Sequence, residues 1–251
     1  MKRLVLRDLG EATRLIYENQ RDWSRKNWCK SLDEHASETE KLLEQLSALY
    51  IWNNKLQSVP AAKELIPEVW MDIYVSITFA NMGLYKHANM SLRSALETGL
   101  RLIYFSTHPT EYNWWKLGQK FGQDERNDVW GGWDYFGTLF LDFEQLCAMD
   151  DMDLFKFNRK WVTELYRNLS GSIHTHAKRL QTTTGYSPKY DSAKYIEWKD
   201  FFCQTNTYLN ILLTLGFTTT FKKMQTGDKS KILDVAIGDF YNDKLRERLG
   251  L

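Results

Sequence analysis

Apolar residues recur at helical spacing along most of the chain, and no run of residues alternates with the two-residue period of a strand. The clearest helix is predicted at 84–105, and further helices are predicted at about 31–56, 68–82, 151–180 and 192–224. The apolar stripe of the first of these consists of Ala88, Leu92, Ala95, Leu96, Gly99, Leu100 and Ile103. The pattern therefore predicts an all-α fold, an up-and-down helical bundle.

Capping and breaking residues predict where two of these helices begin. Ser31 and Glu34 have the spacing of a capping box, which places a helix start at Ser31 and leaves His35 in an exposed first turn. Pro60 and Pro67 are expected to lie in the next connection, because proline disrupts the interior of a helix.

The remaining segments are irregular and suggest how the chain is divided. Residues 1–30 are predicted to be an N-terminal extension, 31–224 the helical bundle, and 225–251 a short charged C-terminal tail. Within the bundle, residues 109–150 are expected to form an insertion with short helices, rich in tryptophan and glycine. Its tryptophans are Trp114, Trp115, Trp130 and Trp133, and its glycines are Gly118, Gly122, Gly131, Gly132 and Gly137.

Composition excludes several classes of protein. Lysine and arginine total 33 against 32 aspartates and glutamates, so no global basic field attracts nucleic acid and any polyanion site must be a local patch. The cysteines are Cys29, Cys147 and Cys203; they are far apart and lack CxxC spacing, which argues against disulfides and a zinc site. The N-terminus has no signal-peptide pattern, and the longest apolar run is too short to cross a bilayer. We therefore expect a cytoplasmic protein without a membrane segment.

The segment 157–180 is the one with a distinct chemical pattern. At about 100° per residue, one sector is apolar and contains Trp161, Val162, Leu165, Leu169, Ile173, Ala177 and Leu180. The opposite sector contains Lys160, Thr163, Arg167, Ser170, Gly171, His174 and Lys178. Arg167 and His174 are seven residues apart, which places them within about 20° of each other and roughly 10 Å apart along the axis. His176 points toward the apolar sector instead.

Two further features set this polar face apart. Gly171 lies between Arg167 and His174, where the missing side chain permits close approach by a substrate or a second helix. From Lys156 to Arg179 there are six basic residues and a single acid, Glu164, in an otherwise balanced chain. The alternative explanation is an ordinary solvated helix face, with the glycine serving helix packing only.

The sequence LYRNLSGSIHTH, residues 165–176, resembles the Arg-x(4–6)-His signature of the HEPN superfamily of RNA-cleaving helical bundles. Arg167 is followed by Asn168, and six residues separate Arg167 from His174. The helix at 84–105, with Arg93 and Glu97 on its polar side, is similar to the central helix of HEPN proteins. The resemblance covers roughly 68–107 and 151–222.

The resemblance implies a metal-independent endoribonuclease that needs no cofactor. His174 would act as general acid or base, because an imidazole titrates near neutral pH. Arg167 would stabilise the charge on the pentacoordinate phosphorus, and Asn168 would hold the scissile phosphate or orient Arg167. The RNA 2′-hydroxyl would attack its own phosphate, giving a 2′,3′-cyclic phosphate and a 5′-hydroxyl.

Supporting roles are expected around these three residues. Lys160 and Lys178 are candidate phosphate contacts, and Ser170 and Gly171 lie on the same face. His176 is a candidate substrate contact or, alternatively, a core or helix-end histidine.

On the neighbouring helix, Glu97 either orients Arg167 or forms a surface ion-pair ladder with Arg93 and Arg101. No clustered carboxylates or HxxE spacing near the motif suggest a metal-dependent nuclease.

The family also implies partners and a biological role. Two protomers usually pack with both motifs in one cleft, so a homodimer is expected. RNA, with tRNA among the implied substrates, would be cut by a toxin or antiviral-defence effector that a protein partner inhibits or activates. The alternative is a non-catalytic HEPN-like module that dimerises, binds nucleotides or acts as a scaffold.

Overall fold

The computed structural model describes residues 10–118, 152–173, 188–238, 245–247 and 249–250, and within 152–173 it describes side chains only for 161–171. Every regular element in these ranges is a helix, and they contain no strand. The prediction of an all-α bundle is confirmed to that extent. The elements are α1 (Glu11–Lys55), α2 (Pro60–Asn81), α3 (Tyr85–Thr107), α4 (Pro109–Lys116), α6 (Met152–Ile173), α7 (Ser192–Gly216), α8 (Thr218–Lys222), α9 (Thr226–Ser230) and the π-helical η3 (Lys231–Ile237).

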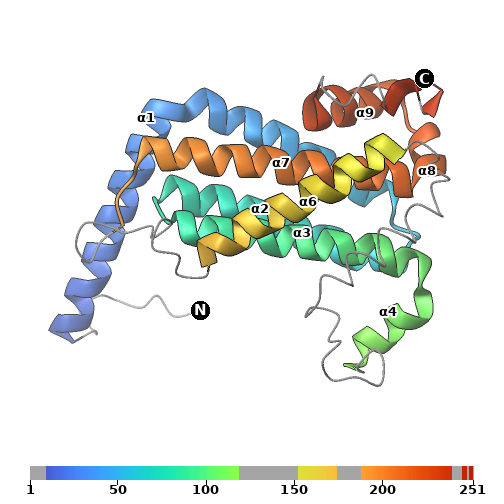
Figure 1. The fold of residues 1–251 in the computed structure, drawn as a ribbon. Helices are drawn as coiled ribbons and strands as arrows, with labels where there is room; N and C mark the ends of the chain where they lie inside the picture. Colours follow the sequence, from blue (N-terminus) through green and yellow to red (C-terminus); the bar gives the residue numbers. More distant parts are fainter. Residues whose placement is uncertain (1–9, 119–151, 174–187, 239–244, 248, 251) are drawn as a thin grey trace.

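The long helices lie roughly side by side (Figure 1). Helices α2 and α3 form a closely packed hairpin; α1 contacts α2, while α6 and α7 both contact α3. In Figure 1, α6 runs obliquely across α3 and α7, and the N-terminal part of α1 extends away from the other long helices.

The core forms because the apolar stripes of these helices face one another. All seven residues predicted for the stripe of α3 are buried. On α6, Val162, Leu165 and Leu169 are buried as predicted. The largest fully buried side chains include Trp52 from α1 and Trp198 and Tyr208 from α7, so aromatic side chains fill much of the interior.

The prediction that a helix starts at Ser31 is wrong. Helix α1 begins at Glu11 and continues through Ser31, with a kink at His35, where φ is −136° and ψ is 30°. Ser31 is buried and donates its hydroxyl hydrogen bond to Asn81 Oδ1 at 2.6 Å, so its side chain joins α1 to α2 and caps no helix. His35 is also buried, contrary to the exposed position expected for it.

Both prolines expected in a connection belong to α2. Pro60 occupies the first helical position, where its missing N–H would have no helical partner in any case. Pro67 lies inside the helix, on its exposed side, next to the buried Ile66. Packing of the surrounding apolar residues therefore offsets the unfavourable proline.

The C-terminal residues that the structure describes pack onto the bundle. Element η3 contacts α1 and α7 and buries four apolar side chains: Ile232, Leu233, Ala236 and Ile237. Thr207 on α7 donates a hydrogen bond to the carbonyl of Ala236 at 3.1 Å. Residues 225–238 therefore complete the core at one end.

The insertion expected at 109–150 is described only as far as residue 118, through α4; residues 119–150 lie outside the described part of the chain. Within the described ranges, no helix combines the length and hydrophobicity needed to cross a bilayer.

Candidate functional site

Helix α6 is exposed to solvent at Arg167, on the side that the sequence predicts to be polar. Arg167 is exposed, whereas Leu165 and Leu169, two residues to either side, are 1% and 0% exposed. A helix rotates by about 200° over two residues, so burial of the two leucines directs Arg167 outward. Asn168, the next residue, is half-buried.

Helix α3 contacts α6 through a cluster formed by Arg93, Glu97 and Tyr166. Arg93 Nε donates to Glu97 Oε1 at 2.8 Å, and Arg93 Nη2 donates to the hydroxyl of Tyr166 at 2.6 Å. The Tyr166 hydroxyl in turn donates to Glu97 Oε1 at 2.9 Å. The guanidinium carbon also lies 4.8 Å from the centre of the Tyr166 ring. We name these three residues the α3–α6 clamp.

The environment of the clamp favours its hydrogen-bonded form. Burial raises the pKa of Tyr166, and the negative charge of Glu97 raises it further, so the phenol remains a hydrogen-bond donor. Burial lowers the pKa of Arg93, but the hydrogen bond and charge of Glu97 outweigh that effect and raise it overall.

The contacts of Glu97 bear on the two roles expected for it. The ion pair between Arg93 and Glu97 is present, as the ladder hypothesis requires. Glu97 also contacts α6, but at Tyr166; among the described residues no hydrogen bond or ion pair joins Glu97 to Arg167. Glu97 therefore does not orient Arg167 by direct contact.

The other candidate residues are only partly described. Gly171 is half-buried, and the hydroxyl oxygen of Ser170 is fully buried, with no hydrogen-bond partner among the residues that the structure describes. Ser170 therefore contributes no hydroxyl to the exposed surface around Arg167. His174, His176 and Lys178 lie outside the described residues, as does the side chain of Lys160.

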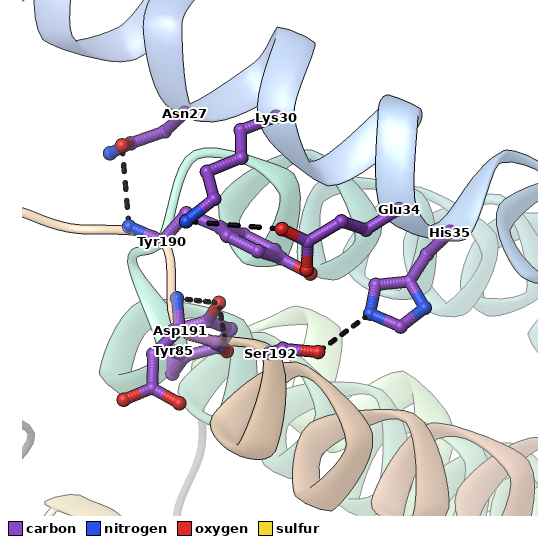
Figure 2. Close-up of polar contacts among 8 residues, drawn as sticks. All are labelled: Asn27, Lys30, Glu34, His35, Tyr85, Tyr190, Asp191 and Ser192. Atoms are coloured by element: carbon purple, nitrogen blue, oxygen red, sulfur yellow. Dashed lines mark hydrogen bonds and ion pairs between the residues drawn. The ribbon is translucent and has the colours of Figure 1, made fainter.

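The structure contains a second polar cluster, which the sequence did not indicate, where α1, the α2–α3 turn and the start of α7 meet (Figure 2). Asn27 Nδ2 donates to the carbonyls of Met82 and Pro188, both at 3.0 Å. The backbone N–H of Tyr190 donates to Asn27 Oδ1 at 3.2 Å. One side chain thus satisfies three backbone groups from two distant segments.

Tyr190 and Tyr85 extend this cluster toward α7. The Tyr190 hydroxyl donates to Glu34 Oε2 at 3.1 Å, and Lys30 Nζ lies 5.4 Å from the centre of the Tyr190 ring. The Tyr85 hydroxyl donates to the carbonyl of Asp191 at 2.9 Å and accepts from the N–H of that residue at 3.1 Å.

His35 lies at the α7 side of the same cluster. Its ring stacks on Tyr195 with centroids 4.4 Å apart, and its Nε2 lies 3.1 Å from Ser192 Oγ. Glu38 Oε1 lies 3.7 Å from His35 Nδ1, too far for a hydrogen bond. Ser192, His35 and Glu38 lie in the spatial order of a nucleophilic triad. Among the described residues, however, the buried Nδ1 of His35 has no hydrogen-bond partner, so Glu38 does not orient the ring as the acid of a triad does. These contacts join α1 to the start of α7. We name the residues that form them the α1–α7 latch: Asn27, Glu34, His35, Tyr190 and Ser192.

No group of three or more histidine, cysteine, aspartate or glutamate side chains within the described ranges is arranged to hold a metal ion. The described residues define the class of the protein as an all-helical bundle with a basic, solvent-facing position on α6. Comparison with models of known protein families, with curated proteins and with solved structures finds no match.

Proposed function

We propose that the protein is a metal-independent endoribonuclease of the HEPN type. The observation that carries the proposal is the exposed position of Arg167 on α6, next to Asn168 and opposite the buried Leu165 and Leu169. A guanidinium that faces solvent is available to a phosphate. It stands within the sequence RNLSGSIH, residues 167–174, whose spacing resembles the HEPN signature.

The proposed reaction uses two chemical functions. An imidazole removes the proton of the RNA 2′-hydroxyl, and the resulting oxygen attacks the adjacent phosphorus. The bond from phosphorus to the 5′-oxygen breaks, and that oxygen takes up a proton from a general acid on the opposite side of the phosphate. His174 supplies the imidazole, while Arg167 donates to the phosphoryl oxygens as their negative charge increases. A two-fold dimer supplies the base from one protomer and the acid from its partner.

The test is cleavage of labelled RNA by the purified protein in the presence of EDTA. Wild-type protein should produce 2′,3′-cyclic phosphate ends, and Arg167→Ala and His174→Ala should each reduce kcat by about 100-fold or more. Matched controls are Arg25→Ala and His87→Ala, since both residues are exposed and distant in sequence from α6. These controls should cleave like the wild type.

Three outcomes would overturn the mechanism: cleavage that disappears with chelator, cleavage that survives His174→Ala, or no cleavage of any RNA offered. If RNA binds without being cut and Arg167→Ala abolishes that binding, the protein is a non-catalytic binding module of the same fold.

We further propose that the target is cellular RNA, with tRNA as the first substrate to examine, and that the enzyme acts as a toxin or antiviral-defence effector. Induced expression of the wild type should then stop growth, and expression of His174→Ala should not. A protein that restrains the enzyme would relieve growth arrest when expressed with it.

A further inference from the structure

The α6 member of the α3–α6 clamp, Tyr166, directly precedes the candidate catalytic residue Arg167 in the chain. Tyr166 forms the clamp, and Arg167 follows it in the chain on the exposed side of α6. The clamp joins residues 73 positions apart in the sequence, so it connects α6 to the central helix of the bundle.

The three polar groups satisfy one another. The Tyr166 hydroxyl both accepts from Arg93 and donates to Glu97, and Arg93 donates to Glu97 as well. The side chains of Arg93 and Glu97 are 25% and 23% exposed, so water screens this contact only in part. Networks of this kind hold side chains in one geometry, because each member donates to or accepts from another member.

The orientation of α6 about its axis determines where Arg167 points. A rotation of about 20° moves a group at the side-chain radius of roughly 5–6 Å by about 2 Å. A misplacement of about 1 Å at a reacting centre lowers a rate by about 100-fold. A contact that prevents α6 from rotating is therefore important for any reaction in which Arg167 takes part.

We propose that Tyr166 is a positioning residue which, held by Arg93 and Glu97, sets the rotation of α6 so that Arg167 and Asn168 face the scissile phosphate. This inference rests on the proposed nuclease function. Glu97 acts through Tyr166, and none of the three clamp residues takes part in proton transfer.

The first variant is Tyr166→Phe, which keeps the aromatic ring over Arg93 and removes only the hydroxyl. We expect kcat for RNA cleavage to fall about tenfold or more with KM nearly unchanged, because misplacement affects the transition state more than initial binding. Tyr50→Phe is the matched control, since Tyr50 is 63% exposed on α1. An unchanged kcat in Tyr166→Phe would overturn the inference while leaving the nuclease function in place.

A second variant, Glu97→Gln, tests whether the clamp acts as a unit and replaces Tyr166→Phe if that protein does not fold. An amide oxygen still accepts from Tyr166 and Arg93, so Glu97→Gln should retain more activity than Glu97→Ala. The kcat losses of Tyr166→Phe and Glu97→Ala should not add in the double variant. Additive losses would show that the two side chains act independently.

Hydrogen exchange of the α6 amides separates failure of the clamp from failure of the proposed function. Exchange near residues 163–171 should be faster in Tyr166→Phe than in the wild type or Tyr50→Phe. Unchanged exchange overturns the clamp whether or not RNA is cut. If exchange responds but the wild type cleaves no RNA, the clamp holds α6 in place and its positioning role is overturned together with the nuclease proposal.

Discussion

Gly99 on α3 lies so close to Leu209 on α7 that a β-carbon added to the glycine would be 2.1 Å from Leu209 Cδ2. Both residues are buried where α3 and α7 cross. The absent side chain at residue 99 therefore leaves room for the side chain of Leu209.

Gly99→Ala should lower the free energy of unfolding by about 1–3 kcal/mol, because the extra methyl group overfills a closely packed contact. Urea denaturation of the purified variant measures the change. Gly227→Ala is the control, because this glycine is also helical and its β-carbon would have no neighbour within 4 Å; without a packing conflict the alanine should leave stability unchanged or raise it by up to about 1 kcal/mol. Equal stability of the two variants would contradict the packing seen here.

Gly83→Ala should be more destabilising than Gly118→Ala. Both glycines follow the end of a helix with positive φ, 74° and 67°, where an alanine introduces backbone strain of about 1–3 kcal/mol. A β-carbon at residue 83 would also lie 2.8 Å from the backbone of Lys189, whereas at residue 118 it would meet nothing within 4 Å. The difference between the two unfolding free energies measures the contact between the α2–α3 turn and the segment preceding α7. A difference near zero would argue against that contact.

Asn27→Ala should destabilise the protein by about 1–3 kcal/mol, because it removes the hydrogen-bond partner of the carbonyls of Met82 and Pro188 and of the N–H of Tyr190. Asn27→Asp should be at least as damaging, since it places carboxylate oxygens next to two carbonyls. Asn19→Ala, at an exposed position on the same helix, is the control for thermal and urea unfolding. If all three variants unfold at the same denaturant concentration, the latch is not formed in solution.

Stability should decrease at alkaline pH. Burial raises the pKa of Tyr190 to about 12 and raises that of Tyr208 well above its usual value. In the unfolded chain tyrosine titrates near 10, so these raised values contribute stability that is complete below about pH 10 and is lost as pH rises further. Denaturation at a series of pH values, monitored by helical circular dichroism and tyrosinate absorbance, measures the loss.

Two comparisons check that the buried tyrosines cause the loss of stability at alkaline pH. The decrease in stability per pH unit should be smaller in Tyr190→Phe than in Tyr74→Phe, because Tyr74 is 42% exposed. Tyrosinate absorbance that develops fully before helix is lost would contradict the prediction.

Local periodicity accounts for the parts of the fold that the sequence predicted well. The apolar stripe of α3 and the two faces of α6 around Leu165, Arg167 and Leu169 are confirmed, because side chains on one face of a helix recur every three to four residues whatever the helix packs against. The relation between Arg167 and His174 stays a prediction, since His174 lies outside the described residues.

The errors occurred where a local signal competed with a distant contact. Ser31 has the sequence context of a helix cap, but its hydroxyl bonds to Asn81 on α2, and α1 continues past it to the kink at His35. Pro67 is predicted to lie in a connection, but it belongs to α2, where the buried residues on the other side of the helix maintain it. In both cases packing between helices outweighed the preference of a short segment.

The sequence by itself determined that the chain is helical, which faces of α3 and α6 are apolar, and that Arg167 is on a polar side, because each of these follows from spacing within a few turns. Only the tertiary structure decided that Tyr166 joins Arg93 and Glu97, and that Asn27 joins the segment before α7. Those partners are 73 and 163 residues apart, and their hydrogen bonds form only because packing of the core brings the helices together.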